Sequence, residues 1–298
     1  MIPSITKNYQ NVVISTGNII NNEVGQRKSN EELYDGLKIT LHSDPNAERV
    51  VVDIDELHGR VLCATQELNN KLTENGRNEI SIGAKIFLNK SSKECVQQAV
   101  DALLNILNVT HVDNVVLAYH PNASASVASA TSAATTPIKT PCSESPSGSS
   151  GNSGTSTISW GKLNGEKGLA ELKLLYKTLE GYAAKHQINQ LGVADLDATT
   201  LEALYKSAKV PPTIAQVNLS NCCVVPTDLQ EFCRDHELVL NTHSDPELLL
   251  PEEQFAGLAP GYKIDWSLRY QVHVRCRGVL TAKGYIVGAS KPVGLAKN

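Results

Sequence analysis

The sequence lacks any apolar run that approaches the ~18 residues needed to cross a membrane. It also lacks the basic start and apolar stretch of a secretory signal, since residues 1–10 are largely polar. The net charge of −4 is small, so composition favours neither nucleic acid nor an anionic membrane as a partner. Neither a Gly-x-Gly-x-x-Gly nor a Walker phosphate loop occurs. With 298 residues, of which 41% are hydrophobic, the chain can bury one large core or two small ones.

A disulfide framework is missing as well. The seven cysteines are odd in number and scattered, unlike the even spacing of small secreted domains. We therefore predict a reducing, cytoplasmic location. Cys63, Cys95 and Cys233 are predicted to be small buried hydrophobic residues. The spacing of Cys222-Cys223 to Cys233 fits no usual zinc site, and we predict no bound metal.

Residues 122–157 lack aromatic side chains and carry only Lys139 and Glu144 as charges. Ala, Ser, Thr, Pro and Gly make up most of this stretch. Such a composition cannot bury enough apolar area to offset the entropy lost on ordering. The sequence therefore predicts a single domain over residues 1–298, interrupted at 122–157 by a disordered loop insertion.

Outside the insertion, strand-like and helix-like segments alternate along the chain. The predicted strands are 12–15, 80–88, 112–118, 191–194, 214–219, 238–242 and 278–282. The predicted helices are 29–41, 91–107, 169–185, 199–208, 226–235 and a segment near 264–273. The first two begin with capping sequences, at Ser29–Glu32 and at Ser91–Glu94. Repeated strand–helix units with continuously apolar strands favour a parallel sheet covered by helices. Six or more such units favour an α/β fold closed as a TIM-type (β/α)8 barrel. The segment 44–78 gives no clear pattern.

Two predicted strands end in polar tips, at Gln216–Cys223 and Leu238–Pro246. In an α/β barrel the loops that follow the strands surround one mouth, where function is placed. The vicinal cysteines Cys222 and Cys223 at such a tip indicate a regulated surface more than a plain core.

Several of these strands resemble those of the aldo-keto reductases. Gly83–Phe87 is similar to the strand that carries the lysine of that family, and Val115–Pro121 to its histidine strand. Leu191–Leu196 is similar to its Gly-Val-Ser-Asn-Phe strand. Leu268–Tyr270, together with Arg277–Lys283, is similar to its last helix–strand unit. The resemblance implies a TIM-type barrel and, as one alternative, an NADPH-dependent aldo-keto reductase.

Reductase chemistry needs a tyrosine that donates a proton to the substrate carbonyl, a lysine and an aspartate that tune it, and a histidine that orients the carbonyl. The resemblance assigns the lysine to Lys85 and the histidine to His120. The nearest match to the Asp–Tyr pair is Asp53 with His58, where histidine stands in place of tyrosine. We predict that these positions are vestigial and that Lys85 and His120 form a hydrogen-bonded pair at the old mouth of the barrel. The alternative is that they bind a small metabolite there.

The cofactor site departs further from the family pattern. Aldo-keto reductases hold the adenosine phosphate with a basic cluster after the last strand, and the only nearby cations here are Lys283 and Lys291. The additional helix and long C-terminal loop of those enzymes have no counterpart before Asn298. We therefore predict that no cofactor binds.

Within this superfamily the closer resemblance is to the modifier (regulatory) subunits of glutamate–cysteine ligase. It rests on Ser15–Asn18, Gln216–Cys223, Thr242–Leu249 and Arg277–Ile286. The resemblance implies a non-catalytic subunit that forms a heterodimer with the catalytic subunit of that ligase. Its implied effect is better use of glutamate and weaker feedback inhibition by glutathione.

The same resemblance implies residues for the contact with the catalytic subunit. Cys222 or Cys223, and next Cys276, are the candidates for a redox-sensitive bridge between the subunits. The loops at 221–225 and 243–249, with His243 and Asp245, and the C-terminal tail are expected to contribute to the contact surface.

Overall fold

The computed structural model describes residues 9–20, 27–42, 52–55, 60–63, 76–121, 165–219 and 224–292, with the backbone alone at 52–55 and 63. The predicted insertion at 122–157 lies outside the described residues, as do His58, Cys222 and Cys223. Among the described residues, no helix is both long enough and apolar enough to span a membrane.

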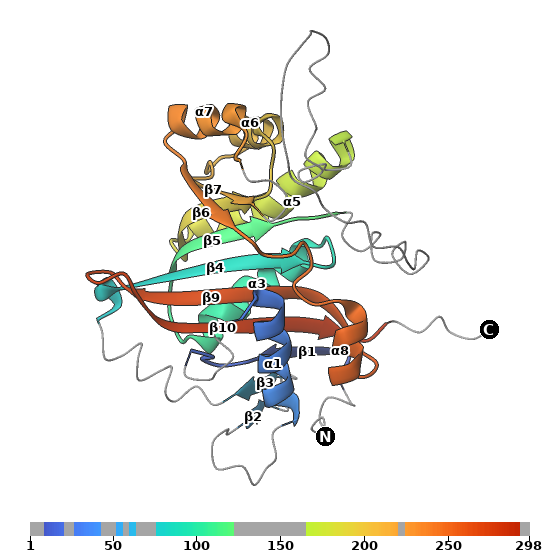
Figure 1. The fold of residues 1–298 in the computed structure, drawn as a ribbon. Helices are drawn as coiled ribbons and strands as arrows, with labels where there is room; N and C mark the ends of the chain where they lie inside the picture. Colours follow the sequence, from blue (N-terminus) through green and yellow to red (C-terminus); the bar gives the residue numbers. More distant parts are fainter. Residues whose placement is uncertain are drawn as a thin grey trace, which may run out of the picture.

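Strands and helices follow one another as Figure 1 shows. The strands are β1 (Asn11–Ser15), β2 (Val52–Asp55), β3 (Arg60–Cys63), β4 (Ile80–Leu88), β5 (Val112–Ala118), β6 (Ile188–Ala194), β7 (Ile214–Asn218), β8 (Val239–His243), β9 (Lys263–Val274) and β10 (Val279–Ser290). The helices are α1 (Ser29–His42), α3 (Lys93–Ile106), α5 (Gly165–Ala184), α6 (Ala198–Ser207), α7 (Thr227–Asp235) and α8 (Glu252–Leu258), with a single 3₁₀ turn at Arg77–Glu79.

The strands β4 to β8 form a continuous parallel series. Each pairs with the next along the chain, from β4 with β5 through β7 with β8. A helix lies between each consecutive pair of these strands. Parallel strands require such crossover connections, and helices on the outer face then bury the apolar strands. The predicted α/β fold of the TIM-barrel type is confirmed, and β4 and β5 begin and end at the predicted residues. Among the described residues, however, the sheet does not close into a ring, because its order ends at β2 and at β8.

The C-terminal part of the sheet differs from the prediction. The segment near 264–273, predicted as a helix, is the strand β9, and the short strand predicted at 278–282 is the twelve-residue β10. These two strands form an antiparallel hairpin that lies between β4 and β1 in the sheet order β2-β3-β1-β10-β9-β4-β5-β6-β7-β8. Figure 1 shows them as two long strands across the middle of the molecule. The expected last helix–strand unit is therefore replaced by a hairpin.

Alternation explains why this segment is extended. The even-numbered residues of β9 from 264 to 272 are apolar and buried: Ile264, Trp266, Leu268, Tyr270 and Val272. A period of two places all five side chains on one face of a strand, whereas a helix would distribute them around its axis. On the neighbouring strand, a Cβ at Gly288 would lie only 2.2 Å from the Trp266 ring, so glycine is required for the indole to pack there.

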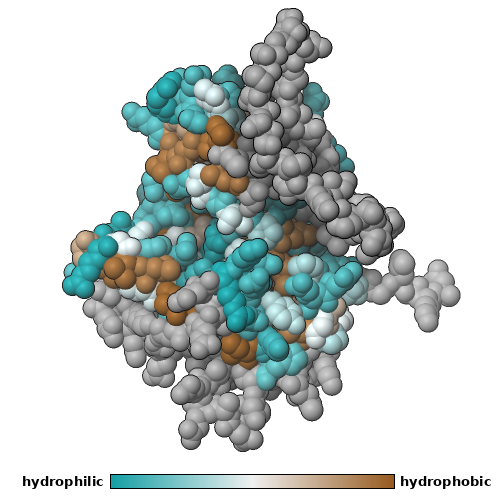
Figure 2. All heavy atoms as spheres, in the orientation of Figure 1, coloured by the Kyte–Doolittle hydropathy of each residue, from teal (hydrophilic) through white to brown (hydrophobic). Residues whose placement is uncertain are grey.

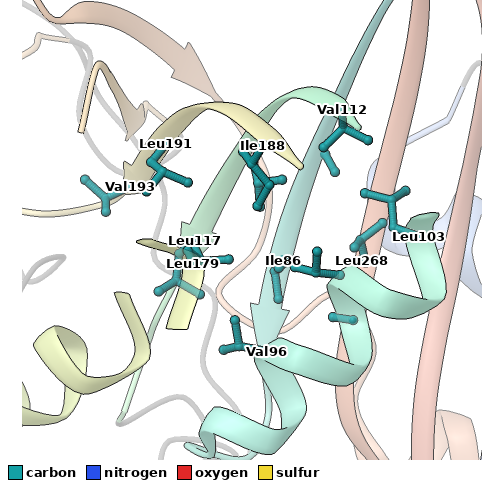
Figure 3. Packing of buried hydrophobic residues seen from close by; sticks show 14 of the residues in the cluster. Ile86, Val96, Leu103, Val112, Leu117, Leu179, Ile188, Leu191, Val193 and Leu268 are labelled. Atoms are coloured by element: carbon teal, nitrogen blue, oxygen red, sulfur yellow. The ribbon is translucent and has the colours of Figure 1, made fainter. Parts of the chain in front are cut away.

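The core has two parts, one on each face of the sheet. In the larger part, the even-numbered residues of β4, such as Ile86, pack against α3, α5, α6 and α7. Figure 3 shows this packing around Val96, Leu103 and Leu179. Cys95 and Cys233 belong to this part as buried residues, which confirms the prediction for both. On the other face, Phe87 packs with residues of β1, β10, α1 and α8. Lys85 shares the parity of Phe87 and therefore projects to this second face.

Candidate functional site

Lys85 is the first residue of a buried polar cluster at the C-terminal ends of the parallel strands. Its side chain is 3% exposed, and its Nζ donates to Asp245 Oδ2 at 3.1 Å. The ammonium group also lies 5.2 Å from the centroid of the Phe87 ring. Burial lowers the pKa of Lys85, because a desolvated ammonium is disfavoured, and the charges of Asp245 and Asp195 act in the opposite direction. The lysine is held in place by a carboxylate rather than exposed to a substrate.

Asp245, which follows β8, receives a second cation from the hairpin. Arg269 on β9 donates from both terminal nitrogens, one to Oδ1 and one to Oδ2, the latter at 3.0 Å. This two-point contact matches the planar guanidinium to the carboxylate. Burial on its own raises the pKa of Asp245, but the charges of Arg269 and Lys85 outweigh burial and hold that pKa well below its usual range. Asp245 is therefore ionised between two cations.

A second buried carboxylate, Asp195, ends β6. It has a left-handed backbone, with φ at 60°, which aspartate tolerates better than most residues. His120 Nε2 lies 2.9 Å from its Oδ2, His243 Nε2 lies 3.0 Å from its Oδ1, and the Asn218 N–H donates to Oδ1 at 2.9 Å. Burial raises the pKa of Asp195, and the hydrogen bonds from the two histidines outweigh burial and lower it.

His243 connects the two carboxylates. Its Nδ1 accepts the backbone N–H of Asp245 at 3.1 Å, so the ring proton is assigned to Nε2, which points at Asp195. Asn218 makes a parallel connection, because its Nδ2 donates to the Asp245 carbonyl at 2.7 Å. The cluster thus joins the ends of β4, β5, β6, β7 and β8 to β9.

A neighbouring ion pair extends this cluster toward α1. Glu32 is 1% exposed, accepts from Lys283 Nζ at 2.8 Å, and accepts from the Tyr285 hydroxyl at 2.6 Å. Burial raises the pKa of Tyr285, and its hydroxyl also bonds Arg269. The predicted capping-box role of Glu32 is wrong: the helix begins at Ser29 itself, and the Glu32 carboxylate faces the sheet instead of the helix end.

The family resemblance implies a bound NADPH, and the described residues do not fit its adenosine phosphate. The phosphate would need free cations next to β10. Lys283 is neutralised by the buried Glu32, and the Lys291 ammonium lies over the Tyr262 ring at 5.1 Å. Both cations that the sequence offers for this site are therefore already engaged within the protein.

The charges of the cluster balance. The cations are Lys85, Arg269 and Lys283, and the carboxylates are Asp195, Asp245 and Glu32. Each carboxylate has a cation or a histidine within hydrogen-bond distance, so the arrangement holds the strand ends together. Among the residues described, no group of three or more His, Cys, Asp or Glu side chains is arranged to bind a metal ion.

The structure brings four of the predicted site residues together and separates others. Lys85, His120, His243 and Asp245 lie in the cluster. Lys85 and His120 do not form the predicted pair: each bonds its own carboxylate. Asp53 lies on β2, at the far edge of the sheet order from β8, and is not a neighbour of β4.

The predicted cysteine Cys276 lies away from the cluster. It is exposed in the turn between β9 and β10, where the Arg275 N–H bonds the Glu79 carbonyl at the start of β4. Cys276 lies seven positions after Arg269, at most about 24 Å away along an extended chain. Cys276 and the strand tips therefore mark opposite ends of the sheet.

The residues that the sequence analysis missed are Asp195, Arg269, Glu32 and Asn218. Asp195 and Asn218 each stand at the end of an apolar strand, the position where a polar residue indicates a site in this kind of fold. Arg269 and Glu32 gave no such signal, because they were assigned to a helix and to a helix cap.

Comparisons with known proteins place this fold in a family. The aldo/keto reductase family model matches residues 58–244, more than half of the chain, and the chain belongs to this family. Over 297 aligned residues it is 29% identical to the glutamate–cysteine ligase regulatory subunit of Homo sapiens, covering 93% of this chain and 92% of that protein. The corresponding subunit of Bos taurus is 28% identical over the same extent. Among solved structures, an aldo-keto reductase enzyme from a Medee basin deep-sea metagenome library is 15% identical, covers 59% of this chain and 47% of its own, and has a TM-score of 0.38.

Proposed function

We propose that this protein is the non-catalytic regulatory subunit of a glutamate–cysteine ligase and binds its catalytic subunit as a heterodimer. The observation that carries the proposal is the alignment with proteins of that name over 93% of this chain and 92% of theirs. A match over nearly the whole length of both proteins includes the hairpin, the strand tips and the sheet. The reducing cytoplasm is the compartment we assign to it.

The strand-end cluster supports a role without catalysis. A reductase needs a tyrosine as proton donor, tuned by a lysine and an aspartate, and the sequence offers His58 in place of that tyrosine. Here Lys85 is buried against Asp245, which Arg269 also binds. His120 is directed at Asp195 rather than toward a substrate. The alternative, an NADPH-dependent aldo-keto reductase, would require these contacts and the Lys283–Glu32 pair to open.

Regulation without catalysis needs only a coupling free energy between two binding events. About 1–3 kcal/mol is enough to change an affinity 5- to 150-fold. The regulatory subunit would favour a state of the catalytic subunit that binds glutamate better than glutathione. That bias requires a contact surface and no reactive group from this chain.

The contact surface includes the loop after β8. The His243 and Asp245 side chains are buried in the cluster, so they shape this loop from beneath rather than contact a partner directly. The exposed positions near them, together with 224–225 and the C-terminal tail, form the proposed surface.

Mixing the protein with the catalytic subunit tests the proposed function. We expect the KM for glutamate to fall and the inhibition constant for glutathione to rise by 5-fold or more, with no change in the ATP requirement. In a parallel titration with NADPH, Trp266 fluorescence should show no saturable quenching. Tight NADPH binding with turnover of a generic aldehyde, and no effect on the ligase, would favour the reductase.

The cysteines provide a separate test of a covalent bridge. Cys276 is exposed and lines an open cavity of about 690 Å³ together with Arg275 and Arg277. Cys222 and Cys223 are our first candidates and Cys276 the next. After oxidation of the complex, non-reducing electrophoresis should show a covalent heterodimer that Cys222→Ser plus Cys223→Ser removes. A band that survives this double variant but is lost with Cys276→Ser would move the bridge to the hairpin, and survival in the variant that carries all three substitutions would exclude all three residues.

A further inference from the structure

The strand β8 is an open edge of the sheet. Among the described residues it pairs with β7 alone, and the sheet order ends there. The Val239 N–H donates to the Thr213 carbonyl, and the His243 carbonyl accepts from the Leu219 N–H, both at 2.9 Å. In a parallel ladder the N–H and C=O of one residue point the same way, and the direction alternates along the strand. The backbone groups of Leu240 and Thr242 therefore point away from β7, toward the open side.

This edge lacks the features that normally prevent strands from pairing with one another. Proteins protect sheet edges with lysine, proline, bulges, inward-pointing charges or very short strands. The other edge, β2, has four residues in the sequence Val-Asp-Ile-Asp. The strand β8 has five residues, none of them lysine, proline or an acidic residue, and it pairs with β7 in unbroken register. Its first residue, Val239, is 52% exposed.

The surroundings of β8 are apolar and acidic. Figure 2 shows hydrophobic surface directly beneath α7, the helix that leads into β8. The exposed acidic residues on α7 and just after it are Asp228, Glu231, Asp235 and Glu237, against the single cation Arg234. A segment that pairs with this edge is favoured if it carries lysine or arginine beside apolar residues.

We propose that an extended segment of the ligase catalytic subunit, with basic and apolar side chains, adds to the sheet along β8. This inference rests on the proposed function and specifies how the partner is held. The partner backbone hydrogen-bonds Leu240 and Thr242, and its alternate side chains contact Val239 and the acidic surface of α7. Addition of a strand to an exposed sheet edge is an established mode of peptide recognition, in which backbone bonds supply affinity and side chains supply specificity.

Proline at position 242 tests the backbone pairing. Thr242→Pro removes an N–H that faces the open side, and proline is tolerated on edge strands at such positions. We expect at least 10-fold weaker binding to the catalytic subunit, measured by titration of the purified subunits. The matched control is Thr242→Val, which keeps the N–H and the shape and should bind within 2-fold of wild type. Equal binding by Thr242→Pro, with its fold intact by circular dichroism, would overturn the proposal.

A second pair of variants avoids any change of the backbone. Val239→Lys places a cation on the edge, where it repels a basic partner, and should weaken binding at least 5-fold. Leu174 is 56% exposed on α5, outside the proposed contact surface, so Leu174→Lys is a control of similar exposure and should bind as wild type. Equal weakening by both lysines would exclude a specific role for β8.

Hydrogen exchange on the complex gives a direct readout. The amides of Leu240 and Thr242 should become protected on binding, while those of Val239 and Asn241, which face β7, are already slow. If wild type fails to bind the catalytic subunit at all, the proposed function fails together with this inference. If wild type binds and the edge amides stay unprotected, the inference alone fails. Self-association that Thr242→Pro abolishes, with ligase binding unchanged, would make the edge a contact between two copies of this chain.

Discussion

Asp245→Asn is expected to destabilise the protein by about 3–5 kcal/mol, the cost of removing one partner from a buried ion pair. The substitution keeps the shape of the side chain and removes its charge. Lys85 and Arg269, whose side chains are 3% and 15% exposed, would then lie together without the carboxylate that both bind. The new amide nitrogen would face the same donors and could accept from neither. The lost charge and the lost acceptor both lower the free energy of unfolding.

Urea unfolding at pH 7 measures this loss. Asp235→Asn is the matched control, because that carboxylate lies on α7 with a 61% exposed side chain and pairs only with its neighbour Arg234. Exposed pairs contribute little, so the control should stay within about 0.5 kcal/mol of wild type. A loss below about 1 kcal/mol in Asp245→Asn would mean that water reaches the cluster and screens its charges.

A second substitution separates the charge from the packing. Lys85→Met removes one buried cation and leaves a flexible apolar side chain beside Phe87. In the double variant with Asp245→Asn, we expect a loss smaller than the sum of the two single losses, by about 0.5–3 kcal/mol. Additive losses would show that Lys85 does not depend on Asp245.

This cluster shows how the charged side chains at the strand ends of a reductase-type fold are neutralised within the chain. The face of the sheet that would hold a polar substrate carries Lys85, His120 and Asp195, which are costly to bury alone. Asp245 neutralises the charge of Lys85 and is itself bound by Arg269, so these contacts are all made within the chain. The strand ends are thereby fixed, together with the start of each loop that follows them.

The parallel part of the fold could be predicted from sequence because its signals are local. An apolar run of strand length predicted β5, and β4 was predicted at the bounds that the structure shows. The predicted cap at Ser91–Glu94 contains the observed one, in which Ser92 rather than Ser91 caps α3 by accepting the Glu94 N–H. Lys85 and His120 were identified because they stand at fixed positions on such strands.

The hairpin could not be predicted in the same way. Its assignment as a helix followed the family pattern and set aside the alternation of Ile264, Trp266 and Leu268. The partners of the site residues were missed for a related reason. Arg269 and Asp245 are 24 residues apart, and only the pairing of β9 with β4 brings them together. Such a contact depends on tertiary structure and leaves no local signal.

The cluster also predicts a steep loss of stability in acid. In the unfolded chain Asp195 and Asp245 titrate near the ordinary value of about 3.9. In the folded chain, the histidines lower the pKa of Asp195, and Arg269 and Lys85 lower that of Asp245. Their contribution is therefore fully present above about pH 4 and is lost as the pH falls below it, because the unfolded state then binds protons that the folded state does not.

Each of the two carboxyls should lower the free energy of unfolding by up to about 1.4 kcal/mol per pH unit in this range, so the two together should lower it by about 2–3 kcal/mol between pH 7 and pH 3. Urea midpoints between pH 7 and pH 3 measure the slope. Asp195→Asn should be less stable at pH 7 and should show a shallower slope below pH 4, since one of the two carboxyls is gone. Asp235→Asn should reproduce the wild-type slope. Parallel slopes in all three proteins would mean that the buried carboxylates take up protons as readily when folded as when unfolded, and the charge cluster would not be what holds the strand ends together.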